Sequence, residues 1–243
     1  MPDVHCIVPA RFTSSRFPGK PLVPICGRPM ILRTLERATA AGCFKSVVCA
    51  TDDFRILKAV EGAGFRGVLT GEAMTGSDRV SEAAKMLGLD LVVNLQGDEP
   101  LADLQMLRDV AKALSDEPAS WITVAAPLAE SDRDVLSVVK VSADSSGYAT
   151  EFTRKLPDDS CAWFRHVGVY AYSAEAREEF SSLPQSKLER ERSLEQLRIL
   201  GKRPIRVVFC TSLSASVDLP SDVQKVETIL KKTDTHESNG KYL

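Results

Sequence analysis

The sequence predicts an α/β fold: a mostly parallel central sheet with helices on both faces, and a small mixed or antiparallel subregion. Three observations support this. Apolar runs alternate with helical patterns through the first half, and strand-like runs with alternating polarity follow one another in the second. The chain also has 243 residues, 44% of them hydrophobic, which suffices for one large α/β domain with a substantial core.

The first half alternates strictly between predicted strands and helices. Strands are expected over four apolar runs, 3–9, 45–50, 66–70 and 90–95. Helices are expected over the amphipathic stretches between them, 29–42, 53–63 and 78–88. A helix over 103–114 and a strand over 121–126 continue the series. This order favours a parallel sheet with right-handed crossovers.

The second half has a different pattern. Alternating polarity predicts strands over 137–143, 147–153 and 163–172, followed by helices over 174–182 and 187–200. A strand over 205–209 and a helix over 220–232 close the fold. We therefore expect a single domain over 1–232, with an embedded subregion over about 137–200. The polar, aperiodic residues 233–243 are expected to form a disordered tail.

Composition excludes several classes of protein. A net charge of −2 is unlike the strongly basic domains that bind nucleic acid. No apolar stretch is long enough to span a membrane, and the N-terminus does not resemble a signal peptide, so we expect a cytoplasmic protein. The six cysteines include no C-x-x-C pair, which disfavours structural zinc, and Cys6, Cys49 and Cys210 are expected to be small buried apolar residues.

A cationic loop follows the first predicted strand. Arg11, Arg16 and Lys20 lie within residues 8–22, among small hydroxyl side chains. Ligands bind open α/β sheets at the carboxyl ends of strands, and clustered cations and hydroxyls suit a polyanion such as a nucleoside triphosphate. A solvated surface loop is the alternative.

Two common nucleotide motifs are excluded. The loop is not a P-loop, because Pro21 replaces the required Ser or Thr and Ser14 stands where the first Gly belongs. The G-x-G-x-x-G match at residues 62–67 closes a helix and precedes a strand, which is the reverse of the dinucleotide-binding context.

Two aspartates are candidate metal ligands. Asp98 follows the apolar strand that ends near residue 95, so it belongs at the same sheet edge as the cationic loop and could hold Mg²⁺ against phosphate oxygens. Simple turn chemistry is the alternative. Asp218 could be a second ligand, or it could cap the helix that begins near Pro220.

Three further polar groups are candidates for ligand contact. Ser77 is a possible helix N-cap, whereas Arg79 has no evident structural role and is a candidate contact. Strand alternation places His166 and Tyr170 on one face, a pair that suits a hydroxylated substrate, although a lone histidine is more often structural. Residues 195–198 lie within a predicted helix, where charge is usually solvated.

Six sequence blocks together resemble one family over residues 3–232. They are PARFTSSRFPGKPL at 9–22, TGSDR at 75–79, NLQGDEP at 94–100, HVGVY at 166–170, LEQLR at 194–198 and VDLP at 217–220. The chain resembles the 3-deoxy-manno-octulosonate (KDO) cytidylyltransferases of lipopolysaccharide biosynthesis. The resemblance implies a Rossmann-like nucleotidyltransferase fold and a homodimer. It also implies transfer of CMP from CTP to the anomeric hydroxyl of KDO, with Mg²⁺, releasing pyrophosphate.

The resemblance also assigns site residues. The catalytic set that it implies is Arg11, Arg16, Lys20 and Asp98. The nucleotide-binding set is Pro9, Ala10, Arg11, Ser14, Lys20, Arg79 and Gln96, and the metal ligands are Asp98 and Asp218. The sugar-acid pocket that it implies is Arg154, His166, Tyr170, Glu195 and Gln196.

The chain departs from the family pattern in three places. Leu219 stands where Thr is usual, and Ser77-Asp78 stand where Thr-Glu is usual. The segment from Arg154 to His166 is shorter than in family members, and it borders the sugar pocket. The alternatives are therefore a cytidylyltransferase for an 8-amino-KDO or another nonulosonic acid, and a non-catalytic nucleotide-binding protein.

Overall fold

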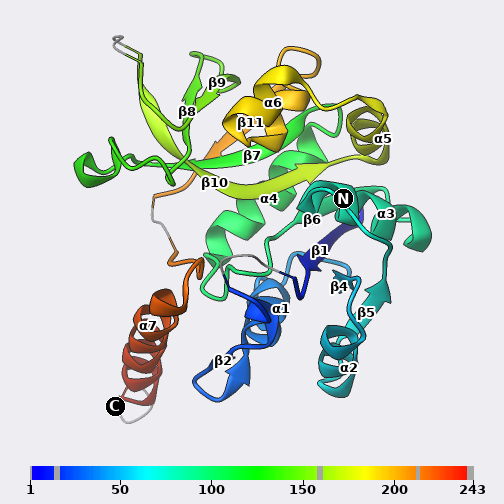
Figure 1. The fold of residues 1–243 in the computed structure, drawn as a ribbon, viewed down its shortest axis with the longest axis vertical. Helices are drawn as coiled ribbons and strands as arrows, with labels where there is room; N and C mark the ends of the chain where they lie inside the picture. The colour runs from blue at the N-terminus through cyan, green and yellow to red at the C-terminus, as the bar shows by residue number, and fades with distance from the viewer. Residues whose placement is uncertain (1, 14–16, 158–160, 212–213, 240–243) are drawn as a thin grey trace.

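A nine-stranded sheet forms the centre of the molecule (Figure 1). The computed structural model describes residues 2–13, 17–157, 161–211 and 214–239. The main path of the sheet is β11 (Ile205–Phe209), β7 (Trp121–Ala126), β10 (Trp163–Tyr172), β6 (Leu91–Asn94), β1 (Val4–Ala10), β4 (Val47–Thr51) and β5 (Arg66–Leu69). Along this path every strand except β10 runs in one direction. The predicted mostly parallel sheet is confirmed.

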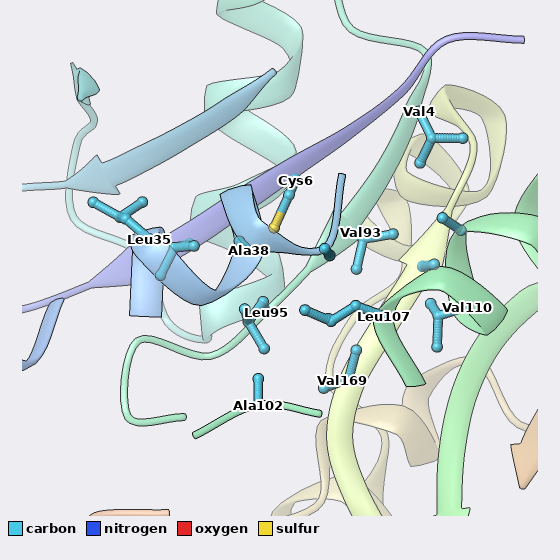
Figure 2. Close-up of a cluster of buried hydrophobic side chains, with 14 of the residues drawn as sticks. Val4, Cys6, Leu35, Ala38, Val93, Leu95, Ala102, Leu107, Val110 and Val169 are labelled. Atoms are coloured by element: carbon cyan, nitrogen blue, oxygen red, sulfur yellow. The ribbon is translucent and has the colours of Figure 1, made fainter. Parts of the chain in front are cut away.

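Helices cover both faces of this sheet, also as predicted. One face carries α1 (Met30–Ala40), α2 (Phe54–Gly62) and α4 (Leu104–Asp116), and the other carries α3 (Gly76–Leu87) and α5 (Ala174–Ser182). Strand β1 serves both layers, because alternate side chains of a strand point to opposite faces. Its Val4, Cys6 and Val8 pack with the first group, whereas Ile7 packs with the second. Figure 2 shows Cys6 beside Ala38 within the first cluster.

Strand β10 joins the antiparallel subregion to the central sheet. Its N-terminal half pairs with β8 (Lys140–Ala143), which pairs in turn with β9 (Ala149–Thr153). Its C-terminal half lies between β6 and β7. The predicted subregion over 137–200 is therefore continuous with the central sheet, and β10 carries residues from one into the other.

The prediction of one continuous helix over 187–200 is wrong, because the structure has two short helices there. Helix α6 (Lys187–Arg192) ends at Ser193, whose φ is 52°, and a short 3-10 helix, η3 (Glu195–Arg198), follows. After this change of direction Leu194 and Leu197 pack in the same core cluster as residues of α3 and α5. The LEQLR block thus lies on a largely buried turn rather than on a solvated helix face.

The last helix is longer than expected. Helix α7 (Pro220–Asn239) continues through residues 233–239, where the sequence predicted a disordered tail, because no glycine or proline interrupts it before Gly240. Residues 240–243 lie outside the described residues. Its first half packs on a hairpin of β2 (Pro24–Ile25) and β3 (Arg28–Pro29), which were not predicted. No helix among the described residues is long and apolar enough to cross a membrane.

Short 3-10 helices complete the described structure. Helix η1 (Lys20–Leu22) forms the end of the cationic loop, and η2 (Glu130–Asp132) follows β7. The prediction of buried cysteines is confirmed for Cys6 and Cys49 but not for Cys210, which is only partly buried at the end of β11. Cys6 and Cys49 are fully buried, and burial raises the pKa of the Cys49 thiol to about 12. Both thiols therefore stay protonated and behave as small apolar side chains.

Candidate active site

Three charged side chains from distant segments converge at the carboxyl end of the parallel strands. The Lys20 Nζ donates to Asp98 Oδ2 at 2.6 Å and lies 4.0 Å from Asp218 Oδ1. The backbone closes the arrangement, because Lys20 Nζ also donates to the Val217 carbonyl at 3.0 Å and Val217 N donates to the Asp98 carbonyl at 3.0 Å. The prediction that both aspartates lie beside the cationic loop is confirmed.

This cluster fits a divalent cation. Two carboxylates already converge on one positive atom, and carboxylate oxygens are the ligands that Mg²⁺ prefers. Negative charge is concentrated here: burial, together with Asp98 and Asp218, raises the pKa of Glu99 to about 8. A bound cation would relieve this repulsion.

A small cavity of about 90 Å³ lies next to the cluster. Its wall includes five residues that were assigned to the nucleotide: Pro9, Ala10, Arg11, Arg79 and Gln96. Backbones approach closely here, since a Cβ on Gly97 would lie 2.8 Å from the Pro9 carbonyl oxygen. Gly97 is therefore required for the loop after β6 to pack against β1. The assigned Ser14 and Arg16 lie outside the described residues.

Arg79 has a structural role that the sequence did not reveal. It is only 3% exposed, and its guanidinium pairs with Asp52 and donates to the Thr70 hydroxyl. These bonds tie α3 to the ends of β4 and β5. The prediction that Arg79 has no structural role is therefore wrong. The predicted N-cap, Ser77, is also wrong by two residues, because Thr75 caps α3 in a capping box with Asp78. Ser77 is thereby free to bond elsewhere.

A larger cavity of about 670 Å³ lies on the other side of Gly76. Four of the five residues assigned to the sugar acid line it: His166, Tyr170, Glu195 and Gln196. His166 and Tyr170 face the same way, as predicted, with ring centroids 5.6 Å apart. The pairing of β10 with β7 shifts register between Val167 and Tyr170, and His166 and Tyr170 stay on one side of the sheet because they pair with Ala125 and Thr123.

His166 is held neutral in a defined tautomer. Thr123 Oγ1 donates to the Val169 carbonyl at 3.1 Å, so it must accept the 2.8 Å hydrogen bond from His166 Nε2. The proton therefore sits on Nε2, and Nδ1 is left as an acceptor. Burial lowers the pKa of His166 to about 3, so the ring stays uncharged near neutral pH.

Two buried polar atoms in this cavity wall are unsatisfied. Glu195 Oε1 accepts from the Ser77 hydroxyl at 3.1 Å, and Gln196 Oε1 accepts from the Tyr170 hydroxyl at 3.2 Å. The other ends, Glu195 Oε2 and Gln196 Nε2, have no hydrogen-bond partner among the described residues. An unpaired buried polar group costs about 1–3 kcal/mol, so we take these two atoms as candidate contacts for a polar ligand.

Arg154 is not among the residues that line this cavity, and its assignment to the sugar acid stays a prediction. Its guanidinium donates to four backbone carbonyls at 3.0–3.4 Å, those of Leu136, Ser137, Arg192 and Ser193. These carbonyls belong to two segments, 136–137 and 192–193. By donating to both, the guanidinium holds the two segments together. Ser137 and Ser193 do line the cavity, so Arg154 supports its rim rather than its wall.

Several wall residues were missed by sequence reasoning. Glu99, Arg165, Arg190 and Ser214 all line the larger cavity. Arg165 Nη1 donates to Asp132 at 2.7 Å. Strand alternation puts Arg165 on the opposite face from His166, so spacing alone would direct it away from a ligand. Glu99 could have been noticed from its position directly after Asp98.

A chain of hydrogen bonds links the two cavities. Gln96 Nε2 donates to Asn94 Oδ1 at 2.9 Å, and Asn94 Nδ2 donates to the Ser77 hydroxyl at 3.2 Å. The Ser77 hydroxyl in turn donates to Glu195 Oε1. One end therefore lines the small cavity and the other end lines the large one.

Known proteins of similar sequence are cytidylyltransferases. A family model described as cytidylyltransferase matches residues 5–204. A 3-deoxy-manno-octulosonate cytidylyltransferase of Anaeromyxobacter dehalogenans (strain 2CP-C) is 41% identical, covering 95% of this chain and 98% of the relative. The enzyme of the same name from Syntrophobacter fumaroxidans is 43% identical, covering 92% and 95%.

Solved structures show the same relationship. A structure of CMP:2-keto-3-deoxy-manno-octonic acid synthetase complexed with CTP superposes with a TM-score of 0.90 at 32% identity, covering 96% of this chain and all of that one. A putative glucose-1-phosphate thymidylyltransferase from Bacillus anthracis, in complex with a sucrose, has a TM-score of 0.70 at 14% identity, covering 93% and 94%, and shares the fold alone. The chain belongs to the 3-deoxy-manno-octulosonate cytidylyltransferase family.

Proposed function

We propose that this protein is a nucleotidyltransferase that moves CMP from CTP to the anomeric hydroxyl of KDO and releases pyrophosphate. One observation carries the proposal. The Lys20–Asp98–Asp218 cluster is joined through Glu99, which directly follows Asp98, to a cavity whose wall holds one unpaired buried acceptor and one unpaired buried donor. A charged centre for a triphosphate therefore lies beside a pocket suited to a hydroxylated acceptor.

The chemistry requires no covalent enzyme intermediate. The anomeric oxygen forms a bond to the α-phosphorus as the bond from that phosphorus to the bridging oxygen breaks. Pyrophosphate leaves with the bridging oxygen, and the hydroxyl proton passes to water. Lys20 would stabilise the negative charge that develops on the phosphates. Asp98 and Asp218 would hold Mg²⁺, which when bound neutralises phosphate charge.

The nucleotide would occupy the end of the site formed by the cationic loop. Pro9, Ala10, Arg11 and Gln96 line the small cavity, and their position supports contacts to the nucleoside. We keep Ser14 and Arg16 in the proposed nucleotide-binding set on the family resemblance. Arg79 would act there mainly by holding α3 in place, since its guanidinium is already paired with Asp52.

The acceptor would be held by hydrogen bonds of defined direction. Glu195 Oε2 and His166 Nδ1 can accept from sugar hydroxyls, whereas Gln196 Nε2 can donate. Tyr170 would orient Gln196 through its own hydrogen bond. This set favours a polyhydroxylated acceptor over an apolar one.

The family relationship supports three further proposals. We propose that the metal is Mg²⁺, that the enzyme serves lipopolysaccharide biosynthesis in the cytoplasm, and that it acts as a homodimer. Sedimentation at micromolar concentration tests the last of these. A species of twice the 26.5 kDa chain mass supports it, and a monomer contradicts it.

Pyrophosphate release tests the function directly. The purified protein is incubated with CTP and Mg²⁺, with each of KDO, an 8-amino-KDO and another nonulosonic acid as the acceptor. We expect release to depend on acceptor and to be fastest with KDO. Faster release with a different sugar acid would show that this acid, and not KDO, is the acceptor. CTP binding without release for any acceptor would indicate a non-catalytic nucleotide-binding protein.

A further inference from the structure

We infer that Arg55, on the first turn of α2, is a positioning residue for the cationic loop. Its guanidinium holds the Phe12 ring, and the ring in turn sets how far Arg11 lies from Lys20. The inference rests on one part of the proposed function, namely that this loop binds the phosphates of CTP. Arg55 acts through Phe12 and touches no substrate itself.

The contact between Arg55 and Phe12 lies just beyond the carboxyl ends of two neighbouring strands. Ala10 at the end of β1 pairs with Thr51 at the end of β4. Phe12 comes two residues after Ala10, and Asp53, the N-cap of α2, comes two residues after Thr51. Ligands bind open α/β sheets at this edge, so a bond between the two segments can shape the site.

Phe12 holds the two ends of the cationic loop together. Its carbonyl accepts a hydrogen bond from Gly19 N at 3.0 Å. Its ring packs on Gly19, where a Cβ would lie only 3.2 Å from Phe12 Cζ, and Gly19 has a φ of 73° that favours glycine. Arg11 directly precedes Phe12 and Lys20 directly follows Gly19, so this contact sets the separation of the two cations.

Arg55 covers the Phe12 ring from α2. The Arg55 Cζ lies 3.3 Å from the ring centroid, which is the distance of a stacked guanidinium. Asp53 fixes the direction of the guanidinium, because Oδ1 accepts from Arg55 Nε at 3.0 Å and Oδ2 accepts from Nη2 at 2.6 Å. These bonds use the edge of the planar group and leave its face to the ring. Asp53 is itself held in place, since it caps α2 by accepting from Arg55 N at 2.8 Å.

The same bonds favour a positioning role over a direct contact with phosphate. The charge of Arg55 is already paired with Asp53, and one face of its guanidinium lies on Phe12. The Arg55 side chain is 61% exposed, and an exposed pair of a cation and an aromatic ring changes an equilibrium constant by about two- to fivefold. We therefore expect a modest loss of phosphate affinity when the pair is removed.

Inorganic pyrophosphate tests the inference, because it carries phosphates without a nucleoside. Calorimetry in Mg²⁺ measures the binding of pyrophosphate and of cytidine to the wild-type protein and to Arg55→Gln. The variant should bind pyrophosphate about two- to fivefold more weakly and cytidine with unchanged affinity. The KM for CTP should rise by the same factor, whereas the KM for the acceptor should not change. Unchanged pyrophosphate affinity in Arg55→Gln overturns the inference, and so does an equal loss of cytidine affinity.

Matched variants separate positioning from direct phosphate binding. Lys58→Gln removes one exposed positive charge from the same helix and should bind pyrophosphate as the wild type does. Phe12→Leu keeps the arginine but removes the aromatic face, so it should lose as much affinity as Arg55→Gln. The double variant should lose no more than either single one, because both changes break the same contact. Additive losses would assign Arg55 a phosphate contact of its own and overturn the inference. Cytidine affinity close to wild type in each variant reports an intact fold.

Failure of the inference and failure of the proposed function give different results. If the wild-type protein releases pyrophosphate from CTP and KDO while Arg55→Gln binds pyrophosphate normally, the function stands and the inference is overturned. If Arg55→Gln shows the expected loss but no acceptor supports product formation, the inference stands and the function is overturned. A wild-type protein that binds no pyrophosphate overturns the inference whatever its activity.

Discussion

The two ends of the site are built in different ways. The nucleotide end takes Lys20, Asp98 and Asp218 from segments that each follow a strand or open a helix, so the rule for parallel sheets brings them together. The acceptor end depends on a register shift in β10 and on a helix broken at Ser193. The first kind of site can be located from element order, whereas the second depends on tertiary packing.

The two ends also differ in electrostatics. At the nucleotide end charges are paired and partly open to solvent, with Asp218 54% exposed. At the acceptor end burial keeps His166 and Tyr170 neutral, since it lowers the pKa of His166 to about 3 and raises that of Tyr170 well above its ordinary value. The difference suits a triphosphate on one side and sugar hydroxyls on the other.

Removing a carboxylate from the nucleotide end should have the largest effect. Asp98→Ala should lower kcat by about 1,000-fold, because Lys20 loses its partner and a metal ligand is lost. Acceptor affinity should stay within about threefold, since no acceptor contact is changed. Pyrophosphate release and calorimetry measure the two quantities.

Asp116→Ala, which changes an exposed acid on α4, provides the control and should behave as wild type. Unimpaired turnover in Asp98→Ala would remove Asp98 from the site. A parallel loss of acceptor affinity would contradict the separation of the two ends.

The buried ion pair behind the acceptor cavity should matter most for stability. Glu189 and Arg198 are 2.6 Å apart with side chains only 4% and 5% exposed. Glu189→Ala should lower the free energy of unfolding by about 3–5 kcal/mol, because it leaves an arginine charge buried without its main partner. Urea unfolding measures this.

Glu191→Ala on the same helix removes an exposed pair with Lys187 and should cost less than about 0.5 kcal/mol. The double variant Glu189→Leu/Arg198→Met should be less destabilised than Glu189→Ala, since no buried charge is left unpaired and Asp78, which also pairs with Arg198, is 23% exposed. Equal losses in Glu189→Ala and Glu191→Ala would contradict the account.

Acidification should weaken the fold through His166. The unfolded histidine binds a proton below about pH 6.5, whereas the folded ring does so only near pH 3, so stability is lost as pH falls through this window. Between pH 7.5 and pH 5 this amounts to about 2 kcal/mol. Urea unfolding at both pH values should show a smaller difference for His166→Gln than for the wild type. An equal difference in both proteins would show that His166 is not held neutral.

The smallest effect is expected in the link between the cavities. Ser77→Ala removes one hydrogen bond to Glu195 and one from Asn94, worth about 1 kcal/mol. The KM for the acceptor should rise about fivefold with kcat nearly unchanged. Ser77→Thr keeps the hydroxyl and should rescue the loss, so a threonine variant as impaired as the alanine one would refute the role of this bond.

The contrast between the nucleotide end and the acceptor end also explains which features could be predicted from the sequence. The order of strands and helices, the two helix layers and the convergence of Lys20, Asp98 and Asp218 all follow from periodicity and from the geometry of parallel sheets. The shared face of His166 and Tyr170 was also predictable, because strand alternation fixes it and the register shift preserves it.

Other features depend on partners that are distant in sequence. The break at Ser193 brings Leu194 and Leu197 into the core, and no local signal marks it. The structural role of Arg79 was missed because its partner, Asp52, is known only after folding, and the same holds for the four carbonyls that Arg154 contacts. The length of α7 was misjudged because polar composition alone does not end a helix.

The central claim is that a triphosphate site and a sugar-acid site meet so that an acceptor oxygen can reach the α-phosphorus. Phosphorus NMR of a reaction containing the protein, CTP, Mg²⁺ and KDO tests it most directly. The account predicts one new phosphodiester signal and pyrophosphate in equal amounts, both absent with Asp98→Ala. Formation of free CMP as the first product, or pyrophosphate release that does not need KDO, would contradict it.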